Sequence, residues 1–305
     1  MEKKAYFWTK IPEMKKTVTS FFAFCVAAVA LCNGNCPLPD PERSPEMIAD
    51  GITEWTVSGV AFWNSDFSGL CFSRDDARMV AAFNSAAIYW LDIPVEGEPL
   101  KFEPFEVEGS GFRVQARDCE CITLNRNTGD IYFGQERDSK DHNGSSVYRI
   151  KAPGYNTEEL VITLPAEITG GGNSGIEGLT WLSEDNLIIG IEGKWSRKTM
   201  SRTAVPTMIF YSESKGITGS VAVPQEIKQI AEIVYDDVRD CVWILDGDYD
   251  KVLYRCTLKG EVLDRYPIPG IKNAEALLLD RTRGCIWIGS DETPSKLYRI
   301  PFRNL

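Results

Sequence analysis

Acidic side chains recur at matching places along this 305-residue sequence and are its best candidates for chemistry. One set begins five apolar stretches: Ser68, Glu120, Glu177, Glu232 and Glu275. A second set ends the apolar stretch that follows each of these: Asn84, Glu136, Glu192, Asp246 and Asp291. Eight of the ten are carboxylates, and a set of hard oxygen ligands without His or Cys favours calcium over zinc or copper. Magnesium is less expected, because it prefers tight octahedral sites with few protein ligands.

Bringing these carboxylates together would carry an electrostatic cost. At about 6 Å and an effective dielectric constant near 20, each pair of charges repels by roughly 3 kcal/mol. Either several of them bind protons or a cation neutralises them. We therefore expect the eight carboxylates to form a calcium site, with Ser68 and Asn84 lining the same channel. The alternative is that the glutamates accept hydrogen bonds from backbone amides of neighbouring repeats and only stabilise the fold.

The elements that must position these residues form a fivefold repeat. Each copy reads as an apolar strand, a polar turn, a second strand that ends in the acid or amide, and a third strand. The copies begin at residues 68, 120, 177, 232 and 275, which are 52, 57, 55 and 43 residues apart. Four-stranded propeller blades repeat at this interval, and their first and second strands run antiparallel. Both acidic sets would then meet at one mouth of the central channel.

We predict an all-β propeller of five four-stranded blades, with six blades as the alternative. A β-sandwich would not return an acid to the same place in repeat after repeat. The last copy has no fourth strand of its own, so we expect residues 52–57 near the N-terminus to supply it. Closing the ring in this way removes the free sheet edges that invite aggregation.

The N-terminal residues have the layout of a secretory signal. A basic stretch at Met14–Lys16 precedes an apolar run over residues 17–31 and a Pro-rich segment. We predict a signal peptide over 1–32, a Pro-rich linker over 33–50 and a propeller domain over 51–305. Met14 is a second candidate for the true start. The expected location is the periplasm or the extracellular space; a lipoprotein anchored at Cys32 is a weaker alternative, because Leu31 is not small.

Charge and cysteine usage narrow the range of partners. Without residues 1–32 the chain keeps 33 − 5 = 28 basic and 44 − 2 = 42 acidic residues, a net charge near −14. Such a surface repels phosphate backbones, so no nucleic-acid partner is expected. No second apolar run could span a membrane. The seven cysteines after Cys32 are irregularly spaced, and we expect them to be small core residues.

Cationic residues flank the predicted acidic mouth. Arg137 directly follows Glu136, and Lys194 and Arg197 follow Glu192. Lys272 precedes Glu275 by three residues. These four cations are candidates for binding an anionic substrate, and the alternative is that they are solvated surface. The single histidine, His142, lies in a polar loop, and there is no G-x-S-x-G elbow or phosphate-binding loop.

Motifs around the first set resemble those of the SdiA-regulated and phytase-like propeller families. Ser68-Gly69-Leu70 is similar to their S-G-[LI] motif, and residues 173–179 (NSGIEGL) to N-x-G-x-E-G-[IL]. Two further motifs, at residues 118–122 and 273–276, resemble D-x-E-G-[IL] and [NQ]-x-E-G, with Cys121 and Ala276 in place of glycine. The resemblance covers residues 52–305 and implies an exported bacterial propeller with an acidic channel.

Two classes of function remain open at this stage. The first is an exported calcium-binding propeller that hydrolyses phosphate esters, esters or lactones, in which the metal polarises an oxygen and a carboxylate activates water. The alternative is a non-catalytic envelope module that binds a glycan, peptide or protein, with Trp63 and Trp195 as contact aromatics. The expected partner is a small molecule or an envelope component of unknown identity, and the residues leave open whether the chain is an enzyme.

Overall fold

The computed structural model describes residues 43–60, 66–84, 87–105, 118–136, 144–155, 157–170, 174–247, 250–268 and 270–305. The predicted signal peptide, Cys32 and most of the predicted linker lie outside these residues. No helix in the described ranges has the length and apolar character that a membrane span requires.

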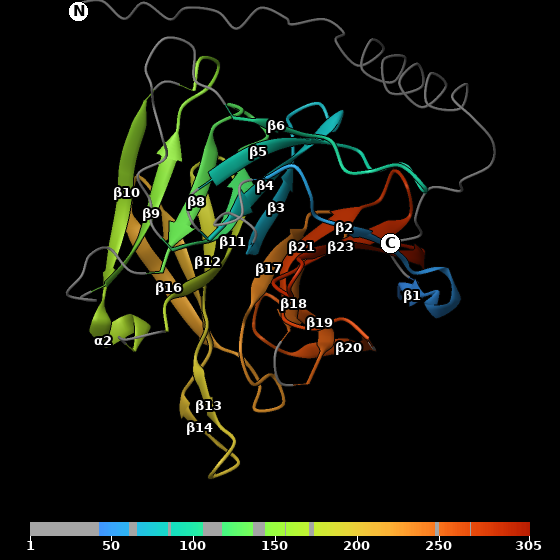
Figure 1. Ribbon diagram of the computed structural model, residues 1–305. Helices are drawn as coiled ribbons and strands as arrows, with labels where there is room; N and C mark the ends of the chain where they lie inside the picture. The colour runs from blue at the N-terminus through green and yellow to red at the C-terminus, as the bar shows by residue number, and fades with distance from the viewer. Residues whose placement is uncertain are drawn as a thin grey trace, which may run out of the picture. The chain divides into compact units, whose positions relative to one another are not determined.

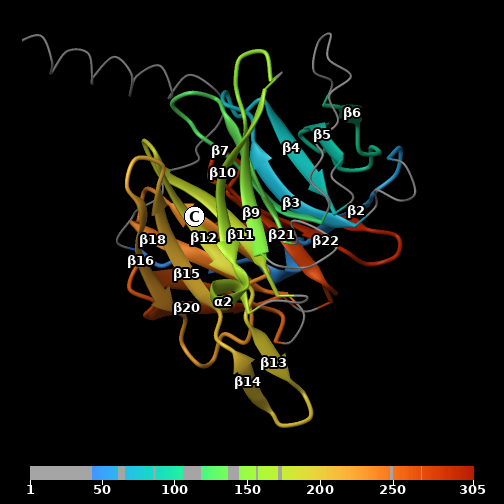
Figure 2. The same ribbon diagram turned by 90° about the vertical axis from the view of Figure 1, so that its left-hand side faces the viewer.

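The described residues form a β-propeller of five blades (Figures 1 and 2). The first blade contains β3 (Phe67–Phe72), β4 (Arg78–Phe83), β5 (Ala87–Asp92) and β6 (Phe102–Pro104). The second contains β7 (Cys119–Leu124), β8 (Ile131–Gln135), β9 (Gly144–Ile150) and β10 (Glu158–Pro165). The third contains β11 (Ile176–Ser183), β12 (Asn186–Ile191), β15 (Thr207–Ser212) and β16 (Gly216–Ala222). The fourth contains β17 (Glu232–Asp236), β18 (Cys241–Asp246), β19 (Val252–Thr257) and β20 (Val262–Pro267).

The fifth blade joins the two ends of the described chain. Its own strands are β21 (Ala274–Asp280), β22 (Cys285–Ser290) and β23 (Lys296–Arg303). Its outer strand comes from the N-terminal side, where β1 (Glu46–Met47) and β2 (Thr53–Thr56) both pair antiparallel with β23. Figure 1 shows these blue strands beside the red β23. The prediction that residues 52–57 close the ring is therefore confirmed.

Turn chemistry explains why each blade folds back at these points. Asp236 ends β17, and its Oδ1 accepts hydrogen bonds from the backbone N–H of Val238 and Arg239. Its Oδ2 accepts one from Trp243 Nε1 at 3.2 Å. Asp280 and Trp287 make the same contact in the fifth blade at 3.0 Å. An Asp at this position thus forms the turn and ties it to a buried Trp of the next strand.

Apolar side chains fill the spaces between neighbouring blades. The described cysteines belong to this packing, since Cys71, Cys119, Cys121, Cys241, Cys256 and Cys285 are all buried and free of disulfides. This confirms the prediction that they are core residues; Cys36 lies outside the described ranges. The five inner strands β3, β7, β11, β17 and β21 pack in sequence around the channel, with β21 against β3.

Elements outside the blades are few. A one-turn helix, α2 (Ala166–Thr169), follows β10, and a 3-10 turn lies at Ala49–Gly51. A hairpin of β13 (Lys194–Ser196) and β14 (Ser201–Ala204) interrupts the third blade between β12 and β15. It projects from the body of the propeller in both ribbon views.

Candidate metal centre

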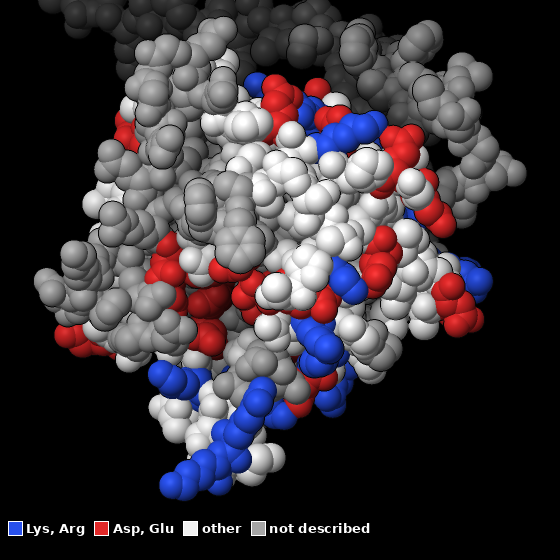
Figure 3. Space-filling view, viewed as in Figure 1, with Lys and Arg blue, Asp and Glu red and all other residues white. Residues whose placement is uncertain are grey.

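An acidic cavity of about 370 Å³ opens at one mouth of the channel. Figure 3 shows a hollow whose visible walls are largely acidic. Most of its lining residues carry an oxygen in the side chain. They are Asp66, Ser68, Asn84, Glu120, Glu136, Glu177, Glu192, Gln229, Ala231, Asn273, Glu275 and Asp291.

A β-bulge places the first acidic set at this mouth. In β7 the register shifts between Cys119 and Cys121, so that Glu120 is the extra residue. The same shift occurs around Ser68 in β3, Glu177 in β11 and Glu275 in β21. The flanking residues Cys119 and Cys121 pack into the core with no exposed surface. A bulge re-aims a single side chain, and here it turns the acid into the channel while both neighbours remain buried.

The second set reaches the cavity from the ends of the second strands. Four of its five members directly follow their strands, and the backbone N–H of each donates to the carbonyl of the residue two positions before the bulge. The pairs are Asn84 to Asp66 (3.0 Å), Glu136 to Asp118 (2.9 Å), Glu192 to Gly175 (3.1 Å) and Asp291 to Asn273 (2.8 Å). This repeated bond fixes the two sets side by side in four of the five blades.

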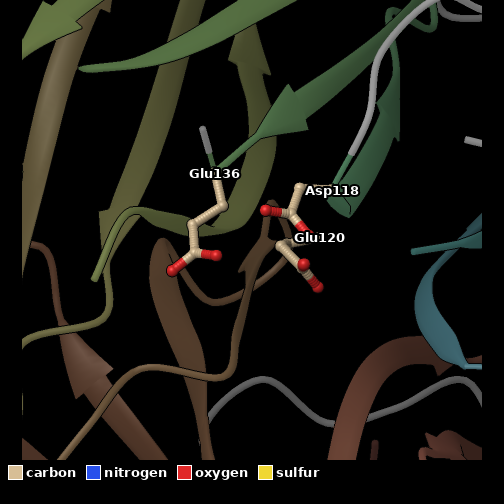
Figure 4. Close-up of side chains that lie close together, drawn as sticks. All are labelled: Asp118, Glu120 and Glu136. Carbon is tan, nitrogen blue, oxygen red and sulfur yellow. The ribbon is translucent and has the colours of Figure 1, made fainter. Parts of the chain in front are cut away.

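Two groups of carboxylates come close enough to share one cation. Oxygens of Asp118, Glu120 and Glu136 lie within 4.8 Å of one another, and so do those of Glu136, Glu177 and Glu192. Figure 4 shows the first group, with its three side chains close together. Glu136 belongs to both groups and is buried. Asn84 Nδ2 donates to Glu120 Oε1 at 2.8 Å, which orients that carboxylate.

The fourth blade departs from the predicted pattern by one residue. In β11, Gly178 lies opposite Gly190, with Glu177 one residue before it and Glu192 two residues after its partner. In β17, Glu232 itself lies opposite Leu245. In this blade the residue one before Glu232 is Ala231, and the residue two after Leu245 is Gly247. These two residues therefore occupy the channel positions. The structure therefore does not bring Glu232 or Asp246 to the acidic cavity.

Both displaced acids accept hydrogen bonds from backbone amides instead. Glu232 Oε1 accepts from the N–H of Leu179 at 3.0 Å and of Ile233 at 2.9 Å, so it joins the third and fourth blades. Asp246 Oδ2 accepts from the N–H of Lys228 at 3.0 Å. No side chain would fit at Gly247, because a Cβ there would lie 1.7 Å from Ala274 O. Glu232 and Asp246 therefore agree with the structural alternative, in which these acids accept hydrogen bonds from backbone amides and stabilise the fold.

Two acids at the site were missed by sequence reasoning. Asp66 lines the cavity, and Asp118 belongs to one of the carboxylate groups. Both lie two residues before a bulged residue, and Asp118 and Asn273 adopt the left-handed φ values of +60° and +44° that Asp and Asn tolerate best. Asp66 and Asp118 each lie two residues before the first-set residue of their repeat. This constant offset could have identified them from the sequence.

Comparison with known proteins places this fold and site in a family. Residues 57–249, more than half of the chain, match the phytase-like family, described as "Esterase-like activity of phytase". The chain belongs to the phytase-like family. The phytase-like part of the resemblance noted above is thereby confirmed, while the SdiA-regulated part stays a resemblance. No curated protein matches the chain.

Solved structures with similar folds share little sequence with this phytase-like chain. One is a gluconolactonase from Xanthomonas campestris, with 12% identity, a TM-score of 0.47, and coverage of 89% of this chain and 99% of that one. Another is a protein of unknown function from Bacteroides thetaiotaomicron, with 9% identity and a TM-score of 0.48. That alignment covers 85% of this chain and 76% of the other.

Burial and repulsion between carboxylates raise the pKa of two side chains in the acidic cavity. Burial raises the pKa of Glu177 well above its usual value, and the charges of neighbouring glutamates, Glu120 first and then Glu192, raise it further. Burial and the adjacent Asp66 carboxyl raise the pKa of Asp291 to about 6. Without a cation, the cavity therefore lowers its charge by taking up protons.

The residues at this mouth fit a hard divalent cation. The donors are carboxylate oxygens with an amide and hydroxyl nearby, and the described residues that line the cavity include neither His nor Cys. The backbone leaves room for the shared ligand, because a Cβ on Gly175 would lie 2.4 Å from Glu136 Cγ. A cation of this kind would contact the two groups that share Glu136.

The predicted anion-binding cations lie around the cavity rather than within it. Lys194 in β13, Arg197 at the turn of the hairpin and Lys272 before β21 are all exposed. None of the three lines the acidic cavity. Figure 3 shows the hairpin carrying basic residues below the acidic hollow. Arg137, His142 and Trp63 lie outside the described residues.

Other side chains near the hairpin have structural contacts. Lys228 Nζ lies over the ring of Trp195 in β13, 5.1 Å from the centroid of that ring. Lys228 also pairs with Asp250. Arg202 of β14 donates to the carbonyls of Val223, Pro224 and Ile227, which fixes the base of the hairpin. These contacts hold in place the hairpin that carries the exposed cations.

Proposed function

We propose that this chain is an exported, calcium-binding propeller that hydrolyses a small anionic ester, phosphate ester or lactone at the acidic mouth. The observation that carries the proposal is the pair of carboxylate groups sharing Glu136, in each of which the oxygens lie within 4.8 Å of one another. Membership of the phytase-like family supports a hydrolytic role.

The ligands proposed for calcium are the carboxylates that the structure gathers. They are Asp118, Glu120, Glu136, Glu177 and Glu192, with Glu275, Asp291 and Asp66 lining the same cavity. Calcium is favoured over magnesium because this many protein oxygens around a roomy cavity suit a large, flexible coordination shell. When bound, the ion would polarise an oxygen of the substrate.

The chain's own residues supply the remaining chemistry. A carboxylate at the rim that does not contact the ion can accept a proton from water, which is the role of a general base. The exposed Lys194 and Lys272 would attract an anionic substrate to a mouth that is itself acidic. With a net charge of −11, the chain is not proposed to bind nucleic acid.

Hydrolysis assays combined with calorimetry test this function. Purified protein is incubated with calcium or with chelator and offered p-nitrophenyl phosphate, p-nitrophenyl acetate and a panel of lactones. We expect calcium to raise the melting temperature and to support turnover of at least one class, and Glu177→Gln to lose most of that turnover. Asp246→Asn is the matched control, because Asp246 lies outside the cavity, and it should retain turnover.

The outcomes separate the competing functions. No effect of calcium on melting would refute the metal centre. A calcium effect without turnover would instead favour a non-catalytic binding module for an envelope component, with the hairpin cations as its contact surface. Turnover that survives both chelator and Glu177→Gln would place the chemistry elsewhere in the molecule.

A further inference from the structure

A second cavity, of about 330 Å³, lies along the channel beyond the acidic one. Its walls come from the later residues of the five inner strands and from the turns that follow them. Four of the side chains that line it are apolar and buried: Leu70, Ile122, Leu179 and Leu277. This cavity shares none of the carboxylates of the acidic mouth.

Glu232 is the carboxyl group of this second cavity. It is only 1% exposed, and its Oε1 accepts the two backbone N–H groups of Leu179 and Ile233. Its Oε2 is buried and has no hydrogen-bond partner among the described residues. A buried polar atom without a partner costs about 1–3 kcal/mol, which a bound molecule could recover.

The protonation of Glu232 indicates which partner Oε2 requires. Burial raises the pKa of Glu232 well above its usual value, and the charge of Glu275 adds to the shift, while its two backbone hydrogen bonds oppose it. Since Oε1 already accepts two N–H groups, the proton belongs on Oε2. In this state Oε2 donates a hydrogen bond and needs an acceptor.

The charges at the mouth of the second cavity are already compensated. Arg126 pairs with Asp76. Arg281 pairs with Asp237 at 3.0 Å and with the buried Asp236 at 2.7 Å. Because these lining cations have carboxylate partners, the mouth calls for neither an anionic nor a cationic ligand.

We propose that this second cavity binds a small uncharged organic molecule, with an apolar body against the four leucine and isoleucine side chains and one carbonyl or hydroxyl oxygen that accepts a hydrogen bond from Glu232 Oε2. The site lies apart from the acidic mouth and does not depend on the hydrolytic function proposed there. It gives the two ends of the channel different ligands.

A matched pair of probes tests the proposal. Cyclohexanone has a compact apolar body and an acceptor oxygen, whereas cyclohexylammonium has the same shape with a charged donor. Titrations of the full chain at pH 7, followed by saturation-transfer NMR, should show saturable binding of cyclohexanone. Its Kd should be at least about tenfold below that of cyclohexylammonium, the effect of one buried hydrogen bond.

Variants locate the binding. Glu232→Gln should retain cyclohexanone binding, because its amide accepts the two N–H groups and still donates, whereas Glu232→Leu should weaken it about tenfold. If the leucine variant does not fold, Val234→Phe provides a second test by filling the cavity. Leu263→Phe is its control, because Leu263 is exposed on an outer strand away from the cavity.

Four results would overturn the proposal. Absence of saturable binding means that water alone fills the cavity. Equal or tighter binding of cyclohexylammonium means that Glu232 is ionised. Binding that is the same in Val234→Phe and Leu263→Phe means that the ketone binds elsewhere, and competition by calcium would assign it to the acidic mouth.

Discussion

Glu177 and Glu232 have the same side chain and begin inner strands of adjacent blades, yet they face different parts of the channel. Glu177 is the extra residue of a bulge and lines the acidic cavity. Glu232 is paired in regular register and accepts backbone hydrogen bonds. In a strand, successive side chains point to opposite sides, so a difference of one residue changes the environment completely.

Glu136 is the residue on which the metal proposal depends most, because it belongs to both carboxylate groups. In Glu136→Gln we expect calcium to raise the melting temperature by less than half as much as in the unmodified protein. In chelator the variant should melt at the same or a higher temperature, since one repelling charge is removed. Differential scanning calorimetry with and without calcium measures both effects.

The control for this experiment is Asp246→Asn, which removes a buried acid that does not line the cavity. It should keep the full calcium response even where its own stability falls. Equal loss of the calcium response in both variants would contradict the assignment of ligands made here.

Asp291 should make the stability of the metal-free protein depend on pH. Its pKa is about 6 in the folded chain and 3.8 as the reference value, so the folded state binds the proton more tightly. The stabilisation of the folded state by this proton is therefore complete below about pH 4 and is lost as the pH rises towards 6. We expect the melting temperature in chelator to fall over this range, by roughly 2–4 °C from this group.

The variant Asp291→Asn should flatten that part of the pH profile. Added calcium should reverse its sign, because binding the cation releases protons and becomes stronger as the pH rises. A profile in chelator that is unchanged by the substitution would show that Asp291 does not carry the dependence.

At the scale of elements, ring closure depends on a short N-terminal strand. Trp55 of β2 is 7% exposed, its ring centroid lies 5.7 Å from that of Trp287, and its Nε1 donates to Val95 O at 3.1 Å. We expect Trp55→Ala to lower the free energy of unfolding by about 3–5 kcal/mol, because it removes the main apolar anchor of the closing strand. Urea titration followed by circular dichroism measures this.

Its neighbour Glu54 provides the matched control on the same strand. Glu54 is exposed and pairs with Lys296 at 3.2 Å. Surface ion pairs contribute about 0–1 kcal/mol, so Glu54→Ala should have a small effect. Similar losses in both variants would mean that β2 does not contribute through the packing of Trp55.

At the scale of the whole molecule, the proposed export depends on the apolar run over residues 17–31. When the complete sequence is expressed in a bacterial host, we expect the mature protein outside the cytoplasm, with its N-terminus at Leu31 or Asn33. Val26→Arg should block this step, since it places a charge in the apolar run. Cell fractionation and N-terminal sequencing provide the measurement.

The control for export is Thr9→Arg, which lies before Met14 and outside the apolar run. It should leave export unchanged. Mass spectrometry of the exported protein also tests the lipoprotein alternative, because a diacyl group on Cys32 would be found only in that case. Retention of uncleaved protein in the cytoplasm would contradict export altogether.

The sequence by itself determined the five blades, the closing strand and the acidic mouth, because strand periodicity, turn residues and an acid at a constant place repeat in each copy. Only the tertiary structure decided which acids meet. The bulges that turn Glu120, Glu177 and Glu275 into the channel leave no mark that separates them from Glu232. Asp66 and Asp118 accept backbone hydrogen bonds from Asn84 and Glu136 of the same blade, so the pairing of the first and second strands places them at the site.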